Sequence, residues 1–330
     1  MKTPITLKLN KDKVQIFTDR FGTLLILLAM MLLMYLLKGN RFISATNLLN
    51  IVRQQSIITL MALGVMLTII TGGTDLSGGS VISLCSCVIA LLAHPVEMGS
   101  NVGQYPLVIP LVTGVLTGAV CGLVNGIFIS YGNVPPFIAT LGMMTAARGM
   151  ALIISNSKPI NGFTKTFDAI GGGNLYGIPI PVFILLIGIV IMYLILHKSK
   201  FGTYVYAIGG NEVAANVSGI GVKRNKAIVY MLAGTFTGIG AIILTSRTMA
   251  GNPSSGTGYE MDAITGAIIG GTSFSGGVGR VVNTVIGALI MGVLTNGMTI
   301  MQIDPNLQMI VKGAVIVFAV LLDQMKTRKN

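Results

Sequence analysis

The sequence predicts an all-α membrane protein of about ten transmembrane helices, some of them short or broken. Its composition is the first observation that indicates this class. Of the 330 residues, 52% are hydrophobic and only 10% are charged, whereas soluble domains typically carry about 25% charged residues. The mean hydropathy is +0.81. A chain with so few charges cannot cover a globule of this size with polar surface, so we expect lipid to surround it.

Ten apolar segments are the second observation, since a helix needs roughly 20 apolar residues to cross the hydrocarbon core. They are residues 21–37, 51–71, 80–93, 106–131, 136–155, 179–196, 227–246, 262–272, 280–301 and 307–322. Segments 80–93 and 262–272 are short and flanked by glycine, which is typical of broken helices that line a cavity. We expect a basic N-terminus over residues 1–20, one membrane domain over 21–323 and a basic tail over 324–330.

The distribution of charge is the third observation. The net charge is +12, and fourteen of the 22 Lys and Arg residues lie in residues 1–20, in the loop 197–226, at Arg280 or in the C-terminal tail. This is the pattern that cytoplasmic loops show under the positive-inside rule. Ten crossings put both termini and the loop 197–226 in the cytoplasm, although Lys38 and Arg41 then lie on the opposite side. No basic stripe with interleaved aromatic residues indicates nucleic-acid binding.

The sequence also contains an internal similarity. Residues 72–79 read GGTDLSGG and residues 270–277 read GGTSFSGG, which are identical at six of eight positions. Each is followed by an apolar segment with glycines and an Asn-Gly pair, at Asn125 and at Asn296. Corresponding glycine-interrupted segments in two halves of a chain indicate a transport pathway. Convergent use of small residues for helix packing is the alternative.

Several charged residues lie within or beside these apolar segments. An ionisable group at membrane depth is costly, so Asp75 is either functional or serves as a cap for the helix that begins near Ser77. Arg148 could pair with Asp75, bind helix-end carbonyls, or extend to the interface as we expect for Lys312. Glu260 and Asp262 begin a short segment, where the helix dipole favours acidic residues, and they could also contact an external protein.

The loop 209–221, GGNEVAANVSGIG, predicts a short helix between basic flanks. Asn211 or Glu212 can begin it, Ala214 and Ala215 favour its continuation, and Gly219 offers a stop. Such a helix could be a contact for a partner that drives movement, or an ordinary surface helix.

Motifs of an enzyme are missing from the sequence. No Lys follows a Gly, so there is no phosphate-binding loop of the Walker type. The two histidines, His94 and His197, are far apart, and Cys85, Cys87 and Cys121 lie inside apolar segments as packing residues. We expect no catalytic residue, no metal and no cofactor, so that ATP hydrolysis or another energy source belongs to a partner.

The motifs together resemble the permease subunits of the ribose/galactose-type ABC sugar importers. The resemblance runs from about residue 44 to Asp323 and is carried by GGTDLSGGSV at 72–81, GLVNGIFISYGNVPPFIATLG at 122–142, FGTYVYAIGGNEVAANVSGI at 201–220, GYEMDAITGAIIGGTSFSGGVG at 258–279 and VKGAVIVFAVLLD at 311–323. Thr74, which precedes Asp75, resembles the galactoside branch of this family slightly more than the others, but one residue does not identify a sugar.

The resemblance implies a fold similar to the type II importer permeases in the bacterial inner membrane, with both termini cytoplasmic. It also implies three partners: a cytoplasmic ABC ATPase, an external sugar-binding protein and a second permease subunit. The residues of the coupling loop that would dock in the ATPase are Asn211, Glu212, Ala214, Ala215 and Gly219. The docking candidates for the binding protein are Glu260 and Asp262.

We therefore expect a monosaccharide permease that works by alternating access. The candidates for its pathway are Asp75, Ser77, Asn125, Arg148, Thr272, Ser275 and Asn296. The alternative is an ion-coupled secondary transporter or channel in which Asp75 binds a cation or proton. A membrane-embedded enzyme is disfavoured by the missing motifs.

Overall fold

The computed structural model describes residues 11–97 and 103–327, which form a bundle of helices with four very short strands. The helices are α1 (Lys11–Lys38), α2 (Asn40–Ile43), α3 (Ala45–Ile70), α4 (Gly78–Leu92), α5 (Val108–Ser130), α6 (Pro136–Ile154), α7 (Lys165–Gly172), α8 (Ile180–Lys198), α9 (Lys200–Gly210), α10 (Glu212–Val217), α11 (Val222–Thr248), α12 (Tyr259–Ile269), α13 (Val281–Ile300) and α14 (Pro305–Thr327). The strands β1 (Ile160–Asn161) and β4 (Ala250–Gly251) pair antiparallel, as do β2 (Asn174–Leu175) and β3 (Ile178–Pro179).

The all-α membrane fold is confirmed. Eight of the described helices, α1, α3, α5, α6, α8, α11, α13 and α14, are long and apolar enough to cross a membrane. The two short segments also form helices, α4 with 15 residues and α12 with 11. The structure therefore contains a helix for each of the ten predicted segments. The second one begins earlier than predicted, at Ala45, because the Ser44 hydroxyl accepts a hydrogen bond from the backbone N–H of Asn47 and caps the helix.

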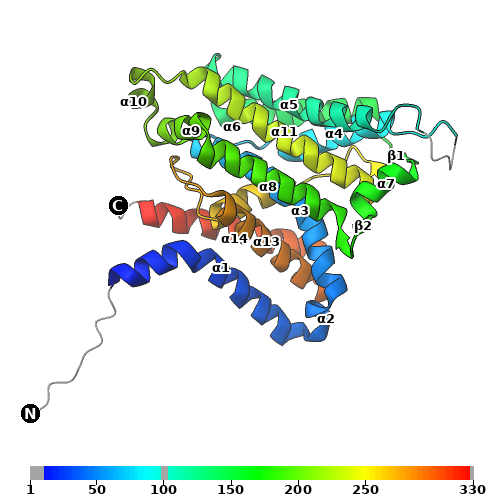
Figure 1. Ribbon diagram of the computed structural model, residues 1–330, viewed down its shortest axis with the longest axis horizontal. Helices are drawn as coiled ribbons and strands as arrows, with labels where there is room; N and C mark the ends of the chain where they lie inside the picture. Colours follow the sequence, from blue (N-terminus) through cyan, green and yellow to red (C-terminus); the bar gives the residue numbers. More distant parts are fainter. Residues whose placement is uncertain (1–10, 98–102, 328–330) are drawn as a thin grey trace, which may run out of the picture.

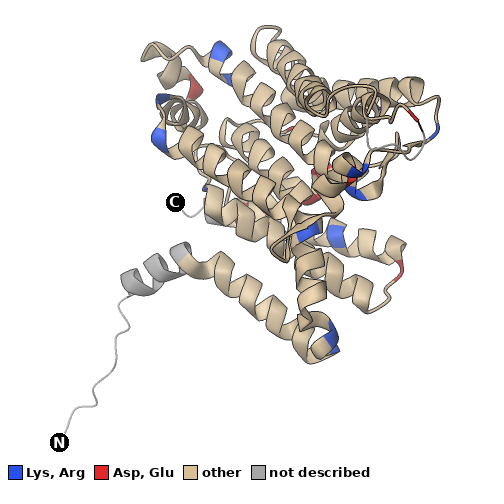
Figure 2. Ribbon diagram, turned by 45° about the vertical axis from the view of Figure 1, so that its right-hand side comes forward, with Lys and Arg blue, Asp and Glu red and all other residues tan. Residues whose placement is uncertain are grey.

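Helix α3 is the centre of the bundle. Its side chains are the most buried among the eight long helices, and it packs against α8, α11, α12 and α13. Helices α4, α5, α6 and α11 form a layer on one side, and α13, α14 and α1 lie on the other (Figure 1). The side chains of α14 are far less buried, so this helix lies on the periphery. Lys, Arg, Asp and Glu occur mostly toward the two ends of the bundle (Figure 2).

Glycines set the closest helix crossings. A Cβ atom at Gly118 of α5 would overlap the carbonyl oxygen of Gly234 in α11, and one at Gly122 would overlap that of Tyr230. In the other half of the chain, Gly287 of α13 lies in the same way against Gly266 of α12. Small residues let two helix backbones approach where lipid offers no hydrophobic driving force between them. This close packing accounts for the glycines that the sequence shows in both halves.

Helices α4 and α12 are half-length helices that begin at a common depth and run in opposite directions. Gly79, in the first turn of α4, lies against Glu260, in the first turn of α12. From there α4 runs parallel to α11, with Ser86 beside Thr245, and α12 runs antiparallel to α13, with Gly266 beside Ala288. Each is preceded by a non-helical segment, residues 71–77 and 249–258. The units α3–α4–α5 and α11–α12–α13 are therefore inverted relative to each other.

This arrangement corrects the interpretation of the two similar motifs. Residues 72–79 lead into α4, whereas residues 270–277 follow α12 and turn toward α13. The segment of the second unit that corresponds to 72–77 is therefore 249–258, which has a different sequence. The similarity of the two motifs reflects two glycine-rich turns and not equivalent positions in the repeat.

The two ends of the bundle differ. The start of α1, the end of α14, and helices α9 and α10 lie toward one end, and α2, α7 and the paired strands lie toward the other (Figure 1). The predicted basic segments 1–20 and 324–330 lie partly outside the described residues, over 1–10 and 328–330.

Candidate functional site

Arg148 of α6 lies at the level where α4 and α12 begin. Its guanidinium donates hydrogen bonds to the carbonyl oxygens of Pro253, of Ser255 at 3.0 Å and of Gly79 at 3.3 Å. Of the three predicted alternatives, binding to main-chain carbonyls is thus the one observed, and the pairing with Asp75 and the extension to the interface are not. Arg148 joins the extended segment before α12 to the first turn of α4.

Asp75 belongs to a second polar cluster within the extended segment before α4. Its Oδ1 accepts hydrogen bonds from the backbone N–H of Ser77 at 2.9 Å and from the Ser77 hydroxyl at 2.6 Å. The Asn125 amide of α5 donates to the same hydroxyl at 3.1 Å. All three side chains are buried. The predicted cap of α4 is not observed, because Asp75 binds the residue that precedes the helix and no side chain accepts from its first N–H groups.

Glu260 and Asp262 are held inside the chain. Glu260 is 7% exposed, its Oε1 accepts from the Gly258 N–H at 3.3 Å, and its charge interacts with that of Arg148. Asp262 forms an ion pair of 2.7 Å with Lys312 of α14. The expectation that Lys312 extends to the interface is wrong, because α14 begins at Pro305 and the ammonium group meets a carboxylate within reach. Neither position gives support to a docking role for Glu260 or Asp262.

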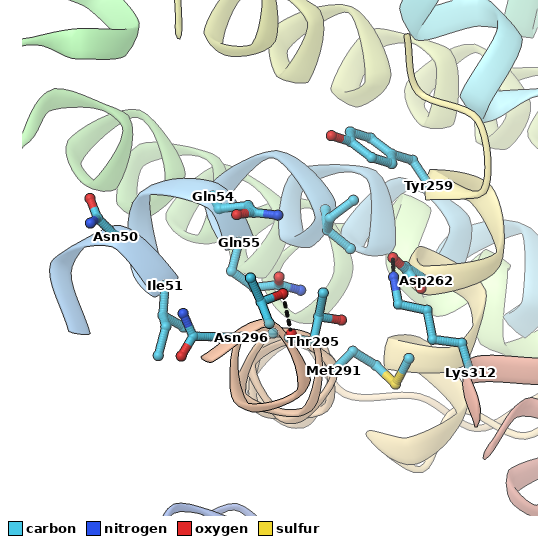
Figure 3. Close-up of a pocket in the computed structure, with 13 residues that line it drawn as sticks. Asn50, Ile51, Gln54, Gln55, Tyr259, Asp262, Met291, Thr295, Asn296 and Lys312 are labelled. Carbon is cyan, nitrogen blue, oxygen red and sulfur yellow. Dashed lines mark hydrogen bonds and ion pairs between the residues drawn. The ribbon is translucent and has the colours of Figure 1, made fainter. Parts of the chain in front are cut away.

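A pocket of about 130 Å³ lies beside this junction, between α3, α12, α13 and α14 (Figure 3). Its lining combines amides and hydroxyls with a few apolar side chains: Asn50, Ile51, Gln54, Gln55, Ile58, Tyr259, Asp262, Met291, Gly292, Thr295, Asn296, Thr299 and Lys312. Of the predicted pathway residues, only Asn296 lines it. Sequence analysis missed Asn50, Gln54, Tyr259 and Thr295, although two polar residues spaced four apart on an apolar helix are a usable signal.

The other predicted pathway residues lie elsewhere. Thr272 is fully buried, and its hydroxyl lies 3.4 Å from that of Thr284. Ser275 is exposed in the turn between α12 and α13. Asn296 exchanges two amide hydrogen bonds with Asn47 of α3, at 3.0 and 2.9 Å. The predicted pathway set is therefore distributed over separate clusters: Asp75 with Ser77 and Asn125, Arg148 alone, Asn296 at the pocket, and Thr272 and Ser275 near α9.

Helix α10 has the predicted limits. The Asn211 side chain accepts a hydrogen bond from the Ala214 N–H at 2.9 Å, and Gly219 ends the turn with a φ of +83°, a conformation that glycine adopts at little cost. Glu212 pairs with Lys226 of α11 at 2.9 Å. Ala214 is exposed, whereas Ala215 is buried against Ile208 and Val222.

Two apolar side chains of α10 were missed by the sequence analysis. Val213 is 74% exposed and Val217 is 83% exposed, and their spacing of four residues puts them on one face. Exposed apolar residues at this spacing on a polar surface indicate a contact surface for another protein. The spacing of the two valines in the sequence was the signal that could have identified this face.

Helix α9 connects α10 to the helices around the junction. Gly209 lies directly against the carbonyl of Ile70, the last residue of α3, and the same carbonyl accepts from the Gly277 N–H at 2.9 Å. The Tyr206 hydroxyl donates to the Gly279 carbonyl at 2.7 Å. A displacement of α10 would thus reach both the end of α3 and the turn between α12 and α13.

In residues 11–97 and 103–327 no group of three or more His, Cys, Asp and Glu side chains could hold a metal ion. Cys85, Cys87 and Cys121 are buried and form no disulfide within this part of the chain.

Comparison with known proteins gives one family and several relatives. The family model described as "branched-chain amino acid transport system / permease component" matches residues 47–320. The ribose import permease protein RbsC of Bacillus subtilis (strain 168) is 44% identical over 288 residues, 87% of each chain. RbsC of Escherichia coli (strain K12) is 40% identical and covers 92% of this chain and 93% of its own. The galactose/methyl galactoside import permease protein MglC of the same strain is 36% identical over 96% of this chain and 98% of its own. No solved structure matches the chain.

Proposed function

Since this chain belongs to the branched-chain amino acid transport system / permease component family, we propose that it is the permease subunit of an ABC importer for a monosaccharide. The relatives confirm the resemblance to ribose/galactose-type permeases that the sequence motifs indicate. The observation that carries the proposal is the near full-length similarity to import permeases for ribose and galactose. A sugar of this kind, with ribose as the first test substance, is therefore the proposed cargo.

The proposed importer brings three protein partners to this chain. A cytoplasmic ATPase binds α10 and closes on ATP, a sugar-binding protein delivers the sugar from outside, and a second permease subunit completes the pathway. The chain itself is a non-catalytic, multi-pass protein of the bacterial inner membrane, with residues 1–20 and 324–330 in the cytoplasm and residues 21–323 as the membrane domain. Helix α10 transmits a rigid-body movement of the ATPase to the spans.

Helix α10 suits the coupling role for three physical reasons. It is short and fixed at both ends by Asn211 and Gly219, so it moves as one body with α9. Val213 and Val217 offer an apolar face that is exposed in this chain. Glu212 and Lys226 add a charge pair at its start. Together with the exposed Ala214 these residues form the proposed coupling surface, and the buried Ala215 attaches the helix to Ile208 and Val222.

We propose roles for the predicted pathway residues from their positions in the structure. Arg148 joins α6 to α4 and to the extended segment before α12, and Asp75, Ser77 and Asn125 hold the extended segment before α4. We assign these four to the support of the half-helix junction past which the sugar moves. Thr272 and Ser275 belong to the turn that contacts α9, and we assign them to its response to α10.

The test is ATP-driven uptake of radiolabelled D-ribose into proteoliposomes that contain the permease, its ATPase and its binding protein. Gly219→Asp or Glu212→Lys should abolish uptake without altering insertion, and Lys158→Glu, on an exposed loop, should leave both unchanged. Normal uptake by both α10 variants would remove the coupling assignment. Uptake that survives ATP depletion but collapses with the ion gradient would overturn the importer assignment.

A further inference from the structure

The pocket between α3, α12, α13 and α14, seen in Figure 3, contains polar groups in two pairs that face it from neighbouring helices. Asn50 and Gln54 stand four residues apart on α3, and Thr295 and Thr299 stand four apart on α13. Tyr259, the first residue of α12, lies at its other side. Polar residues in apolar spans normally find partners or serve a function, because lipid offers them no hydrogen bonds.

The polar side chains around this pocket divide into two sets. One set is fully engaged within the chain: Gln55 donates to the Ala288 carbonyl, Asn296 pairs with Asn47, and the Thr299 hydroxyl donates to the Thr295 carbonyl. In the other set, the side chains of Asn50, Gln54, Tyr259 and Thr295 have no hydrogen-bond partner in the described part of the chain. Asn50 and Gln54 are exposed at the mouth of the pocket, and Tyr259 and Thr295 are half-buried. Gln55 and Asn296 hold α3 and α13 together, and the second set is free to bind a ligand.

The charge of the pocket restricts the chemistry of that ligand. Its only charged side chains in the described chain are Asp262 and Lys312, and their ion pair of 2.7 Å neutralises both. The unpartnered groups are amides and hydroxyls, which can donate and accept. Ile51, Ile58 and Met291 supply an apolar wall, and Tyr259 an aromatic ring. A neutral ring with hydroxyls on its edges and C–H groups on its faces matches this lining.

The size of the pocket is consistent with such a ring. Its volume of about 130 Å³ is several times the ~30 Å³ that one water takes in the liquid. It therefore has room for a small polyhydroxylated molecule.

We propose that this pocket is a binding station for the transported monosaccharide within the membrane, with Asn50, Gln54, Thr295 and the Tyr259 hydroxyl as its hydrogen-bonding groups. The proposal rests on the proposed function for the identity of the sugar, but the binding of a neutral sugar by this pocket can be measured without transport. The Asp262–Lys312 ion pair fixes α12 to α14 and so closes one side of the station.

The absence of Trp from the chain makes a direct measurement possible. Tyr259→Trp introduces a single indole at the pocket while an aromatic ring is retained. Addition of D-ribose to this purified variant should change its fluorescence with a saturable dependence, and betaine at equal osmolarity should not. Scintillation proximity binding of radiolabelled D-ribose to the unaltered chain is the second measurement, and it detects the site even where the indole weakens binding.

Matched variants then test the assignment of the side chains. Thr295→Val and Gln54→Leu each remove one hydrogen-bonding group from the pocket and should weaken ribose binding about five- to tenfold. Thr145→Val is the control, because the Thr145 hydroxyl is exposed on α6 and bonds only to carbonyls of its own helix. It should leave binding unchanged.

The outcomes separate this proposal from the importer assignment. No saturable binding by either method, in protein that still imports ribose with its partners, would overturn the station alone. Equal affinities in Thr295→Val, Gln54→Leu and Thr145→Val would do the same. Saturable binding that Thr295→Val and Gln54→Leu weaken, in a chain that shows no ATP-driven uptake, would support the station and overturn the proposed function.

Discussion

Arg148 and Asp75 illustrate how a charged side chain is stabilised inside an apolar bundle. Arg148 binds carbonyl oxygens of the extended segment before α12 and of the first turn of α4, and Asp75 binds a backbone N–H and a hydroxyl of the extended segment before α4. Each charge thus meets polar groups of the segments that interrupt the helices. The charges and the breaks in the helices are two parts of one arrangement, so a change in either disturbs the other.

Arg148→Met should destabilise the protein by about 1 to 3 kcal/mol, because the carbonyls of Pro253, Ser255 and Gly79 each lose a charged donor inside the bundle. Arg148→Lys should recover part of the loss, since an ammonium group can donate to some of the carbonyls but lacks the planar fork. Unfolding of the purified protein by SDS titration measures the effect. Lys158→Met, on an exposed loop, is the control. Equal stability of Arg148→Met and Lys158→Met would contradict the role of the guanidinium.

At the scale of the elements, the half-length helices α4 and α12 place extended segments in the middle of the bundle. Two full-length helices would fill this depth with apolar side chains, whereas extended segments expose main-chain groups that only protein partners can satisfy. The long helices α5, α11 and α13 must then pack closely around these extended segments. Glycine contacts between α5 and α11 and between α12 and α13 provide that closeness.

Gly118→Leu should prevent correct packing of α5 against α11, since a side chain at this position overlaps the Gly234 main chain. Gly142→Leu is the matched control within a membrane helix, because a Cβ at Gly142 of α6 meets nothing within 4 Å. We expect Gly118→Leu to yield aggregated or poorly expressed protein and Gly142→Leu to yield a single symmetrical peak. Gel filtration in mild detergent and thermal unfolding compare the two. A monodisperse Gly118→Leu protein with unchanged thermal stability would show that this crossing is not essential.

These elements also show how much of the fold can be predicted from the sequence alone. Segment length and apolar composition predict the long helices, and glycine beside segments 80–93 and 262–272 predicts the short ones. The ion pair of Lys312 with Asp262 could not be predicted, because it joins residues fifty positions apart on helices whose contact arises only from tertiary packing. The same holds for the pocket: Gln54 and Gln55 are adjacent in the sequence, yet one faces the pocket unpartnered and the other binds Ala288.

At the scale of the whole molecule, the bundle is asymmetric from end to end. Helices α9 and α10, the start of α1 and the end of α14 share one end (Figure 1), and fourteen of the 22 Lys and Arg residues belong to segments at that end in the sequence-based topology. Positively charged loops are retained in the cytoplasm during insertion. We therefore propose that the end that carries α10 faces the cytoplasm, where an ATPase would reach it.

Cysteine labelling can test this orientation, because the native thiols are buried. Cys85 and Cys87 are fully buried and Cys121 is 6% exposed, whereas Tyr176 is 95% exposed at the opposite end and Val217 is 83% exposed on α10. In right-side-out membrane vesicles, a membrane-impermeant maleimide should label Tyr176→Cys at once and Val217→Cys only after permeabilisation. The unaltered chain should remain unlabelled throughout. Labelling of Val217→Cys in sealed vesicles, with Tyr176→Cys protected, would place α10 outside, where no ATP-driven partner could bind it, and the coupling role of α10 would then be untenable.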